Sequence, residues 1–487
     1  MAPPRYNRLH GGSGPSAAGS GRSFLEGLAR RPQRIVPLAL TFFLALSFVT
    51  WLSFTSTGSE TAKQWASNAK SQASGWISSA GGKGKQPEKY QASEISPADA
   101  LYTFKPGDPP VTYAELEKWG EKGDDGNIYP PQFIPALANK APRAKAGFIV
   151  LVRNSELESM QASMREVEDR FNRKYGYPWI FLNDVDFTDE FKAGVRALTR
   201  SEIRFGKVEK EHWGYPSWID QKKAADTREK MTLKKVLYGG SESYRHMCRF
   251  QSGFFYRHPL TKDLDYYWRV EPGIKLFCDL DYDPFLFMQM NNKTYGFTMA
   301  LHEYVETVPT LYSATKQFFD LNPQYMAKDA SWHFLTDEPE RHFDAGWNLC
   351  HMWSNFEIAD LRFWRSEAYS KYFDHLDQAG GFFYERWGDA PVHSLAVSIM
   401  LDRSRLHHFN DIGYTHVPFS HCPVNRKKYH DNGKCNCKPE NSFDEHPYSC
   451  LKEWWRTAKE GKPKRSSAIE ERNEKLRSLG AGALVDA

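Results

Sequence analysis

The stretch AGFIVLV, residues 146–152, decides the fold class that we expect for this chain. An unbroken apolar run with several β-branched residues is typical of a strand buried on both faces of a mostly parallel sheet. The polar residues Arg153 and Asn154 follow at once and end the run. The sequence therefore predicts a central strand with polar groups at its carboxyl end.

A helix and a second strand follow this first strand. Apolar residues recur at alternating spacings of three and four, as one face of a helix requires: they are Leu157, Met160, Met164, Val167 and Phe171. Gly176 and Pro178 then end the helix, and residues 179–182 predict a short strand that ends at Asn183 and Asp184. Strand, helix and strand in this order indicate a βαβ unit of an α/β domain.

The carboxyl ends of these strands mark the expected ligand side of the domain. Ligands of open α/β sheets bind outside these ends, so Arg153 and Asp184 are candidates for ligand contacts. No Gly-x-Gly-x-x-Gly follows the first strand, and a dinucleotide is therefore not indicated. Further strands are expected at residues 266–270 and 295–300, and helices near 366–379 and 393–402.

An apolar run near the N-terminus predicts a membrane anchor. Residues 35–59 contain no charged side chain, and about 20 apolar residues span a bilayer core. Six arginines and one acid precede the run, so the positive-inside bias keeps residues 1–34 in the cytosol. We therefore expect a transmembrane signal-anchor at residues 35–56 with the following chain in a lumen. A cleaved signal peptide is the alternative, but its apolar core is shorter, roughly 7 to 15 residues.

The segments that follow the anchor differ in composition. Residues 57–86 are rich in Ser, Ala, Gly and Lys, and prolines recur up to residue 142, so residues 57–140 are expected to form a lumenal stem. One folded domain is expected at residues 141–455, followed by a charged C-terminal tail at 456–487. The formal net charge is only +4 and the basic residues are scattered, so no nucleic-acid partner is expected.

All seven cysteines lie after residue 247, on the expected lumenal side. An oxidising lumen permits disulfides, which would leave one thiol unpaired. Cys422, Cys435, Cys437 and Cys450 could instead be drawn as a zinc site, but they lack paired Cys-x-x-Cys units, and disulfides are favoured. Residues 292–294 (Asn-Lys-Thr) form the only N-glycosylation acceptor triplet, a pattern that also occurs by chance.

Glu271 is the first candidate for a metal site. It follows the expected strand 266–270, and Pro272 with Gly273 predicts a turn directly after it. A hard cation needs oxygen donors at such a position, although a solvated or ion-paired acid gives the same pattern. The alternating acids of residues 279–283 (DLDYD) look like another metal motif, but a half-solvated strand alternates in the same way. Glu271 is therefore preferred.

Three further positions combine an acid or a histidine with unusual neighbours. Glu357 stands among aromatic and apolar residues, where a buried charge would need a partner such as Arg362. Asp389 lies in a tight turn, where it could serve only as a helix N-cap. His416 stands near Pro418, and a lone histidine is more often structural than a ligand. These residues are candidates that need a wider context.

Six blocks of the sequence supply that context. They are GFIVLVRN (147–154), YWRVEP (267–272), CDLDYD (278–283), NLCHMWSNFEI (348–358), RWGDAPVH (386–393) and GYTH (413–416). In this order the blocks resemble the fungal Golgi α1,2-mannosyltransferases of glycosyltransferase family 15. The resemblance covers about residues 140–455, and the anchor with its stem is similar to that family's layout.

The resemblance implies a fold and a reaction. The fold would be GT-A-like, an α/β nucleotide-sugar-binding mixed sheet flanked by helices. The enzyme would use GDP-mannose and Mn²⁺, and would add mannose with retention to the 2-hydroxyl of a terminal mannose on glycoprotein glycans, either N-linked or O-linked. It would lie in the Golgi membrane as a single-pass type II protein. A cation with fixed donors suits this reaction because it stabilises the charge of the departing GDP.

The family pattern, together with the strand ends, also gives roles to single residues. The expected metal ligands are Glu271 and His416, the expected catalytic residues are Glu357, Tyr244 and Asp389, and the expected substrate-binding residues are Arg153, Arg269 and Asp184. Glu357 matches the acid proposed as the nucleophile. A retaining enzyme can use such an acid covalently, or can let the acceptor attack on the leaving-group face, and both mechanisms stay open.

Two other functions fit parts of the sequence. A non-catalytic lumenal lectin would keep aromatic and acidic sugar contacts but would not need both Glu271 and Glu357. A membrane-anchored glycosidase needs two carboxylates about 5 to 10 Å apart, which Glu357 and Asp389 could supply. The βαβ unit and the metal-type residues favour the transferase.

Overall fold

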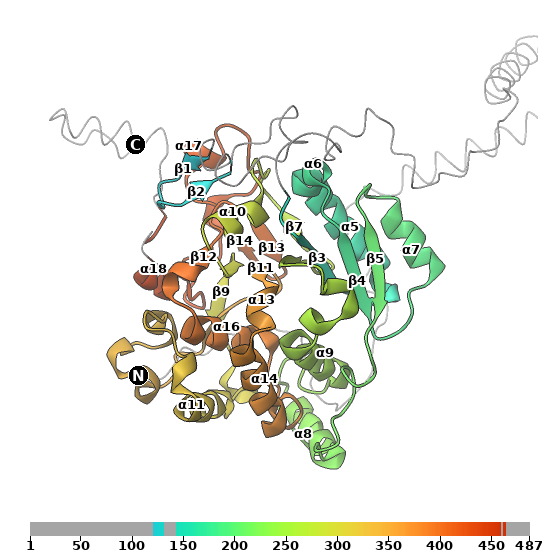
Figure 1. Cartoon of the computed structure of the whole chain (residues 1–487), viewed down its shortest axis with the longest axis vertical. Helices are drawn as coiled ribbons and strands as arrows, with labels where there is room; N and C mark the ends of the chain where they lie inside the picture. Colours follow the sequence, from blue (N-terminus) through green and yellow to red (C-terminus); the bar gives the residue numbers. More distant parts are fainter. Residues whose placement is uncertain (1–119, 131–142, 459–460, 464–487) are drawn as a thin grey trace, which may run out of the picture. The chain divides into compact units, whose positions relative to one another are not determined.

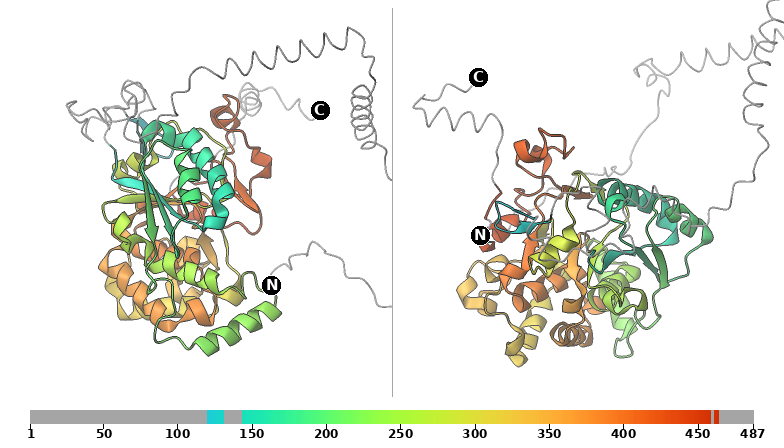
Figure 2. Two further views of the ribbon diagram at one scale, coloured as in Figure 1. Left: turned by 90° about the vertical axis from the view of Figure 1, so that its right-hand side faces the viewer. Right: turned by 45° about the horizontal axis from the view of Figure 1, so that its top comes forward.

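A computed structural model describes residues 120–130, 143–458 and 461–463 of the chain. The expected anchor at 35–56 lies outside these residues, as do the cytosolic tail and most of the stem and of the C-terminal tail. Within the described ranges, no helix combines the length and the apolar character that crossing a bilayer requires. The folded part is shown in Figure 1 and, from two further sides, in Figure 2.

A seven-stranded mixed sheet forms the centre of the domain, in the strand order β12-β8-β11-β6-β3-β4-β5. Its strands are β3 (Ala146–Leu151), β4 (Trp179–Asn183), β5 (Ile203–Lys207), β6 (Tyr266–Arg269), β8 (Tyr295–Phe297), β11 (Glu357–Asp360) and β12 (Leu406–His408). Strands β6, β3, β4 and β5 run parallel, whereas β11 is antiparallel to both of its neighbours. The α/β prediction with a mostly parallel sheet is therefore confirmed, with one antiparallel strand in its middle.

Alternating side chains of the central strands build a core on each face of the sheet. Phe148 and Val150 pack on one face beneath α5 (Leu157–Val167) and α7 (Asp189–Arg196). Ile149 points to the other face. The helices on that face are α9 (Glu242–Gly253), α14 (Glu367–Ala379) and α16 (Asp389–Met400). In Figure 1, α9, α14 and α16 lie below the strands of the sheet, and α7 lies beside β5 at the right. A strand buried on both faces explains why residues 146–152 are apolar throughout.

The predicted βαβ unit is present, with one local irregularity. After α5 the chain forms a π-helical turn at Glu168–Asn172 and the short α6 (Arg173–Tyr175). In this turn the buried Glu168 accepts hydrogen bonds from Asn172 and from the Trp179 indole. Gly176 then ends the helix with a φ of 72°, a left-handed conformation that favours glycine.

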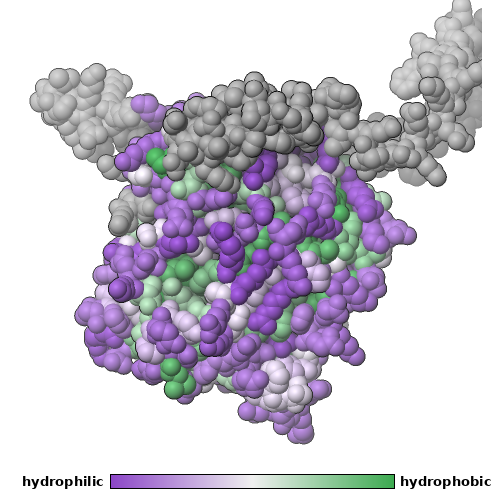
Figure 3. Space-filling model, viewed as in Figure 1, coloured by the Kyte–Doolittle hydropathy of each residue, from purple (hydrophilic) through white to green (hydrophobic). Residues whose placement is uncertain are grey.

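The remaining elements surround this unit. The other helices are α8 (Gln221–Leu233), α10 (Pro284–Met290), α11 (Leu311–Leu321), α12 (Trp332–Leu335), α13 (Leu361–Trp364), α15 (Gly381–Tyr384), α17 (Arg426–Tyr429) and α18 (Leu451–Thr457). Small sheets are formed by β14 (Phe419–His421), β13 (Tyr414–His416) and β7 (Lys275–Leu276), by β10 (Cys350–Met352) and β9 (Ala300–His302), and by β1 (Glu121–Lys122) and β2 (Ile128–Tyr129). Polar residues cover most of the face seen in Figure 3.

Three predicted elements need correction. The strand expected at residues 295–300 is divided into β8 and β9. The helix expected near 393–402 begins earlier, at Asp389. The acids of residues 279–283 do not alternate along a strand, because this segment has no regular structure. Asp279 and Asp281 form ion pairs with Arg170 and Lys434 instead.

The hairpin β1–β2 lies within the segment expected to be a stem. The Ile128 backbone and the Asn291 side chain exchange two hydrogen bonds, of 2.8 and 2.7 Å. The Tyr129 ring packs against Tyr282 and Phe287. These contacts attach residues 121–129 to the end of α10, so the ordered structure begins before residue 141.

Three disulfides confirm the interpretation of the cysteines. They join Cys278 to Cys435, Cys350 to Cys450, and Cys422 to Cys437. The unpaired thiol is the buried Cys248. Because the four cysteines of the C-terminal cluster are all oxidised, they offer no thiolate to a zinc ion.

Candidate active site

The register between β6 and β11 brings two predicted site residues together. Arg269, the last residue of β6, lies opposite Glu357, the first residue of β11. Glu271 follows β6 by two residues, before a turn in which Gly273 has a φ of 83°. The site is therefore built at the carboxyl end of a parallel strand, as the sequence predicts for a ligand-binding edge.

Glu271 and His416 form a half-buried pair at this edge. Strand β13 reaches it through its pairing with β7, and the His416 Nε2 lies 3.3 Å from a Glu271 carboxylate oxygen. Burial opposes ionisation of Glu271, but the charges of Arg269 and His416 outweigh it and lower its pKa to about 2. Burial also disfavours charge on His416, whereas the contact with Glu271 raises its pKa above the usual value.

Arg269 links this pair to Asp389. Its guanidinium donates to Glu271 at 2.5 and 3.0 Å, and to Asp389 Oδ2 at 2.5 Å. Asp389 is the first residue of α16 and also accepts a 2.6 Å hydrogen bond from the Ser354 hydroxyl. Despite burial, the positive charge of Arg269 holds the Asp389 pKa below its usual value. The N-cap interpretation of Asp389 is therefore wrong, because Gly388 is the N-cap of α16 and the Asp389 carboxylate bonds Arg269 and Ser354 instead.

Glu357 lies next to Arg269, is surrounded by polar groups and is only 1% exposed. Its two oxygens accept hydrogen bonds from the hydroxyls of Tyr267 at 2.6 Å and Tyr295 at 3.0 Å. The His393 Nδ1 lies 3.1 Å from the second oxygen. The expected partner Arg362 is not involved, because it pairs with Asp360. Hydroxyl donors from two strands and a histidine from α16 thus surround this carboxylate.

His393 contacts Glu357 from α16. Its Nε2 lies 3.0 Å from the backbone oxygen of Gln251 in α9, so both ring nitrogens face oxygen acceptors. The ring also stacks on Trp364 at a centroid distance of 4.3 Å, which restricts its orientation.

Tyr244 belongs to a second group of residues, on α9. Its hydroxyl accepts a 3.4 Å hydrogen bond from Arg386, which in turn pairs with Glu303 at 3.3 Å. The Tyr238 ring stacks on Tyr244 at 4.5 Å. Arg153 contacts the same helix through a 3.1 Å hydrogen bond to Ser243. Arg153 and Tyr244 are therefore neighbours through Ser243.

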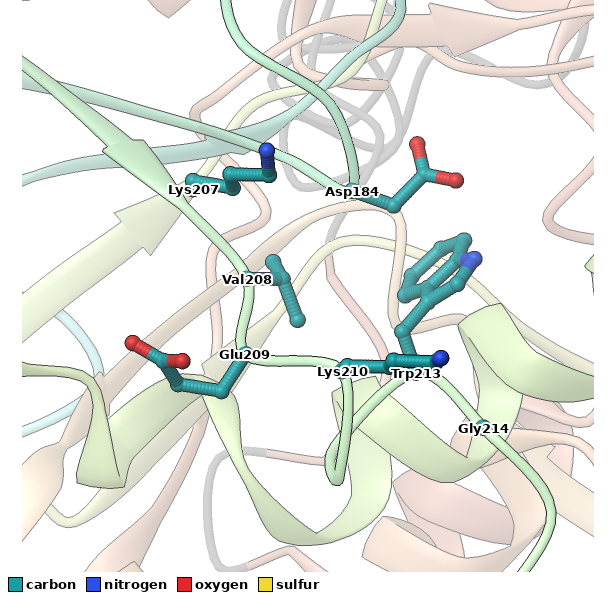
Figure 4. Close-up of a pocket in the computed structure, with 7 residues that line it drawn as sticks. All are labelled: Asp184, Lys207, Val208, Glu209, Lys210, Trp213 and Gly214. Atoms are coloured by element: carbon teal, nitrogen blue, oxygen red, sulfur yellow. The ribbon is translucent and has the colours of Figure 1, made fainter.

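Asp184 lines a hollow at the ends of β4 and β5. The hollow has a volume of about 560 Å³, and Lys207, Lys210 and Trp213 contribute to its wall. Figure 4 shows the Asp184 carboxylate beside the Trp213 indole, with the Lys207 side chain on the other side. Two acids, two lysines and an aromatic ring thus line this hollow. Among the described residues no hydrogen bond or ion pair joins Asp184 to Arg269.

The structure thus unites five of the eight predicted residues in one hydrogen-bonded or adjoining group: they are Arg269, Glu271, Glu357, Asp389 and His416. Sequence reasoning missed the residues that hold Glu357. The spacing of Tyr267 and Arg269 places both on one face of β6, which was the available signal for Tyr267. Tyr295 and His393 come from distant elements and gave no such signal.

Comparisons with known proteins identify the family of this chain. Residues 115–459 match the family model described as glycolipid 2-alpha-mannosyltransferase. The chain belongs to this family. Glycolipid 2-alpha-mannosyltransferase 1 of Candida albicans is 54% identical over 336 residues, which are 69% of this chain and 77% of that protein. An alpha-1,2 mannosyltransferase of Saccharomyces cerevisiae is 53% identical, over 66% of this chain and 81% of its own.

Solved structures of the family show the same fold. Core-mannan synthase A from Aspergillus fumigatus, in its Mn/GDP form, is 39% identical with a TM-score of 0.61, over 75% of this chain and 94% of that one. The mannosyltransferase Ktr4p from S. cerevisiae, in complex with GDP, is 36% identical with a TM-score of 0.63, over 74% and 96%.

Proposed function

We propose that this protein is a retaining α1,2-mannosyltransferase that moves mannose from GDP-mannose to the 2-hydroxyl of a terminal mannose on a glycoprotein glycan. The observation that carries the proposal is the buried Glu357 carboxylate, held by Tyr267 and Tyr295 beside the Arg269–Glu271–His416 group. Family membership and the names of the relatives support it. In this proposal the sheet is of the GT-A type.

The nucleotide would lie along the carboxyl ends of β3, β4 and β5. Asp184 can accept hydrogen bonds from a guanine edge, and the Trp213 ring beside it can stack on the base. Arg153 would stand near the diphosphate, at the end of β3, together with Tyr244 on the facing helix. The GDP named in the titles of two solved relatives supports this assignment.

Glu271 and His416 would hold the metal ion. One carboxylate oxygen and one imidazole nitrogen, 3.3 Å apart and about one quarter exposed, fit a divalent cation such as Mn²⁺. When bound, the ion supplies positive charge that stabilises the departing diphosphate. The Mn/GDP form of core-mannan synthase A supports the choice of metal.

The residues of the chain account for the rest of the chemistry. Glu357 would place a fixed negative charge against the sugar, where it stabilises an oxocarbenium-like centre or bonds to it. The hydroxyls of Tyr267 and Tyr295 orient this carboxylate, and its burial excludes competing water. Arg269 and Asp389, as a rigid ion pair, would bind sugar hydroxyls at the same edge.

The glycosidase alternative is disfavoured by Asp389. A glycosidase needs a general acid that stays protonated near neutral pH, so its pKa must be raised. Arg269 instead lowers the pKa of Asp389.

The proposed location is the Golgi membrane, with a cytosolic N-terminus and the catalytic domain in the lumen. Three disulfides support an oxidising compartment, because cytosolic proteins rarely retain them. The expected anchor of about 20 residues is near the short end of membrane spans, which favours the thinner membranes of the early secretory pathway.

A transfer assay tests the proposal. The purified full-length chain is given α-methyl mannoside with GDP-mannose or other sugar nucleotides, in the presence of Mn²⁺ or a chelator, and the product is analysed by NMR. We expect an α1,2-linked dimannoside from GDP-mannose alone, formed only with the metal. A β-linked product would refute retention, and release of mannose from glycans without a nucleotide would establish a glycosidase instead.

A further inference from the structure

The acceptor triplet Asn292-Lys293-Thr294 forms the turn between α10 and β8. Asn292 is exposed and has a φ of 50°, the left-handed conformation that asparagine adopts more readily than most residues. Lys293 and Thr294 are buried. Among the described residues, no hydrogen bond engages the Asn292 side-chain amide, which stands at the surface. Asn292 therefore has room for a large substituent.

The turn lies at the end of the sheet opposite the candidate active site. The Thr294 backbone oxygen accepts a 2.8 Å hydrogen bond from Asp360, the last residue of β11. Asp360 pairs with Tyr266, the first residue of β6, whereas Glu357 pairs with the last. A substituent on Asn292 would thus project from the edge that does not bind substrate.

We propose that Asn292 carries an N-linked glycan. The Asn292 Nδ2 would attack C1 of a lipid-diphosphate-linked oligosaccharide on the lumenal transferase. A C1–N bond forms, the C1–O bond to the diphosphate breaks, and Nδ2 loses a proton as the lipid diphosphate leaves. The three disulfides support passage through the compartment in which this reaction occurs. The glycan would stand beside the β1–β2 hairpin, because Asn291 binds Ile128.

The contacts of Thr294 in the folded domain indicate that this modification precedes folding. The transferase reads the hydroxyl at the third position of the triplet, yet the Thr294 Oγ1 accepts hydrogen bonds of 3.1 and 2.7 Å from Arg405 and is buried. The triplet can therefore be read only before β8 pairs with β12, while the chain is still unfolded.

One other asparagine has a weaker acceptor pattern, Asn348-Leu-Cys350. Its amide nitrogen donates a 3.1 Å hydrogen bond to Phe334, and Cys350 is bonded to Cys450. A glycan on this amide would have to fit beside the Phe334 contact, so modification of Asn348 conflicts with formation of the folded domain.

The test uses the full-length chain from a eukaryotic host and treatment with a peptide N-glycosidase. We expect the enzyme to remove the mass of one glycan from the wild type, and Asn292→Asp to abolish that shift. Aspartate is the suitable replacement because it also tolerates positive φ. Thr294→Ser keeps the acceptor hydroxyl and is the matched control that should retain the glycan. Transfer activity of Asn292→Asp should stay within about twofold of the wild type.

Two outcomes would overturn the proposal: a wild-type chain without the shift, or a shift that persists in Asn292→Asp. The variant Lys230→Asn shows whether an unmodified Asn292 means only that this residue is not glycosylated, or that the chain does not reach the lumen. It creates an acceptor triplet at 230–232 on the exposed side of α8. If only this variant is glycosylated, the chain enters the lumen but Asn292 is not modified. If neither chain is glycosylated, both the modification and the lumenal location are contradicted.

Discussion

Glu357 and Glu271 lie at the same edge of the sheet, next to the same arginine, but their surroundings differ. Glu357 is 1% exposed and is held by two tyrosine hydroxyls and a histidine. The Glu271 side chain is 25% exposed and is held by cations, Arg269 on one side and His416 on the other. Burial suits a group whose position must not change, and partial exposure suits a group that exchanges ligands.

This difference indicates that the two acids have different roles. Hydroxyl donors orient Glu357 without cancelling its charge, so the charge remains available to a sugar. The partners of Glu271 are themselves positive or can become so, and a divalent ion can take their place. We therefore expect Glu357 to govern the chemical step and Glu271 to govern metal binding.

The largest effect is expected for Glu357→Gln. The amide keeps the size of the side chain and can bond both tyrosine hydroxyls, but it carries no charge. We expect kcat to fall by at least about a thousandfold, as for loss of a central catalytic group. A radiolabelled transfer assay measures kcat, and circular dichroism verifies the fold. Activity within tenfold of the wild type would show that Glu357 is not a catalytic residue.

The next effect concerns the metal site. In Glu271→Gln and in His416→Ala we expect the Mn²⁺ concentration for half-maximal activity to rise by more than about tenfold, with recovery at high Mn²⁺. Chelator treatment of the wild type should abolish transfer reversibly. The proposed difference between the two acids is wrong if added Mn²⁺ restores the activity of Glu357→Gln. It is also wrong if both metal-site variants need the same Mn²⁺ concentration as the wild type.

A smaller loss is expected from the tyrosines that hold Glu357. Tyr267→Phe or Tyr295→Phe removes one hydrogen bond to a buried carboxylate, worth about 1.5–3 kcal/mol, so kcat should fall roughly 10- to 150-fold. The KM for GDP-mannose should not change, because these residues act through Glu357. Tyr266→Phe is the matched control, since this neighbouring residue contacts Arg362 instead. An equal loss in the control would point to a general packing defect.

The last prediction concerns stability rather than transfer activity, and tests the burial of His408. Burial, with the nearby His421, lowers the pKa of His408 to about 3. Since the unfolded chain binds a proton near pH 6.5 and the folded one does not, stability should fall as the pH drops below 6.5 toward 3. The contribution is at most about 1.4 kcal/mol per pH unit.

His408→Gln provides the measurement. The glutamine can still donate to the Thr298 oxygen that His408 contacts, but it does not titrate. Melting temperatures between pH 7 and 4 should decline less steeply than in the wild type. The exposed His333→Gln is the control and should leave the slope unchanged. Identical slopes in all three proteins would mean that His408 is protonated in the folded state.

Several parts of this account follow from the sequence because the signal is local. The run 146–152, the helical spacing after it and Gly176 identify the βαβ unit, since each depends on neighbouring residues. Glu271 could be predicted for the same reason, because a turn directly follows its strand. The cysteine spacing likewise favoured disulfides over zinc.

Other parts could not be predicted because they depend on register between distant strands. Tyr267 and Tyr295 meet at Glu357 only because β11 lies between β6 and β8. The residues around Asp389 predicted only a turn. Its bond to Arg269 could not be predicted, because the two residues are 120 positions apart. The acids of 279–283 show the opposite case, since a conspicuous pattern there serves ion pairs and a helix cap.

Titration calorimetry tests most directly whether Glu357 serves the chemical step and Glu271 serves metal binding. It measures the binding of GDP and Mn²⁺ to a variant of each residue. We predict that Glu357→Gln binds GDP with Mn²⁺ as tightly as the wild type while it no longer transfers mannose. Glu271→Gln should lose the Mn²⁺-dependent part of GDP binding. Loss of that binding in Glu357→Gln, or its retention in Glu271→Gln, would contradict the assignment of the two carboxylates.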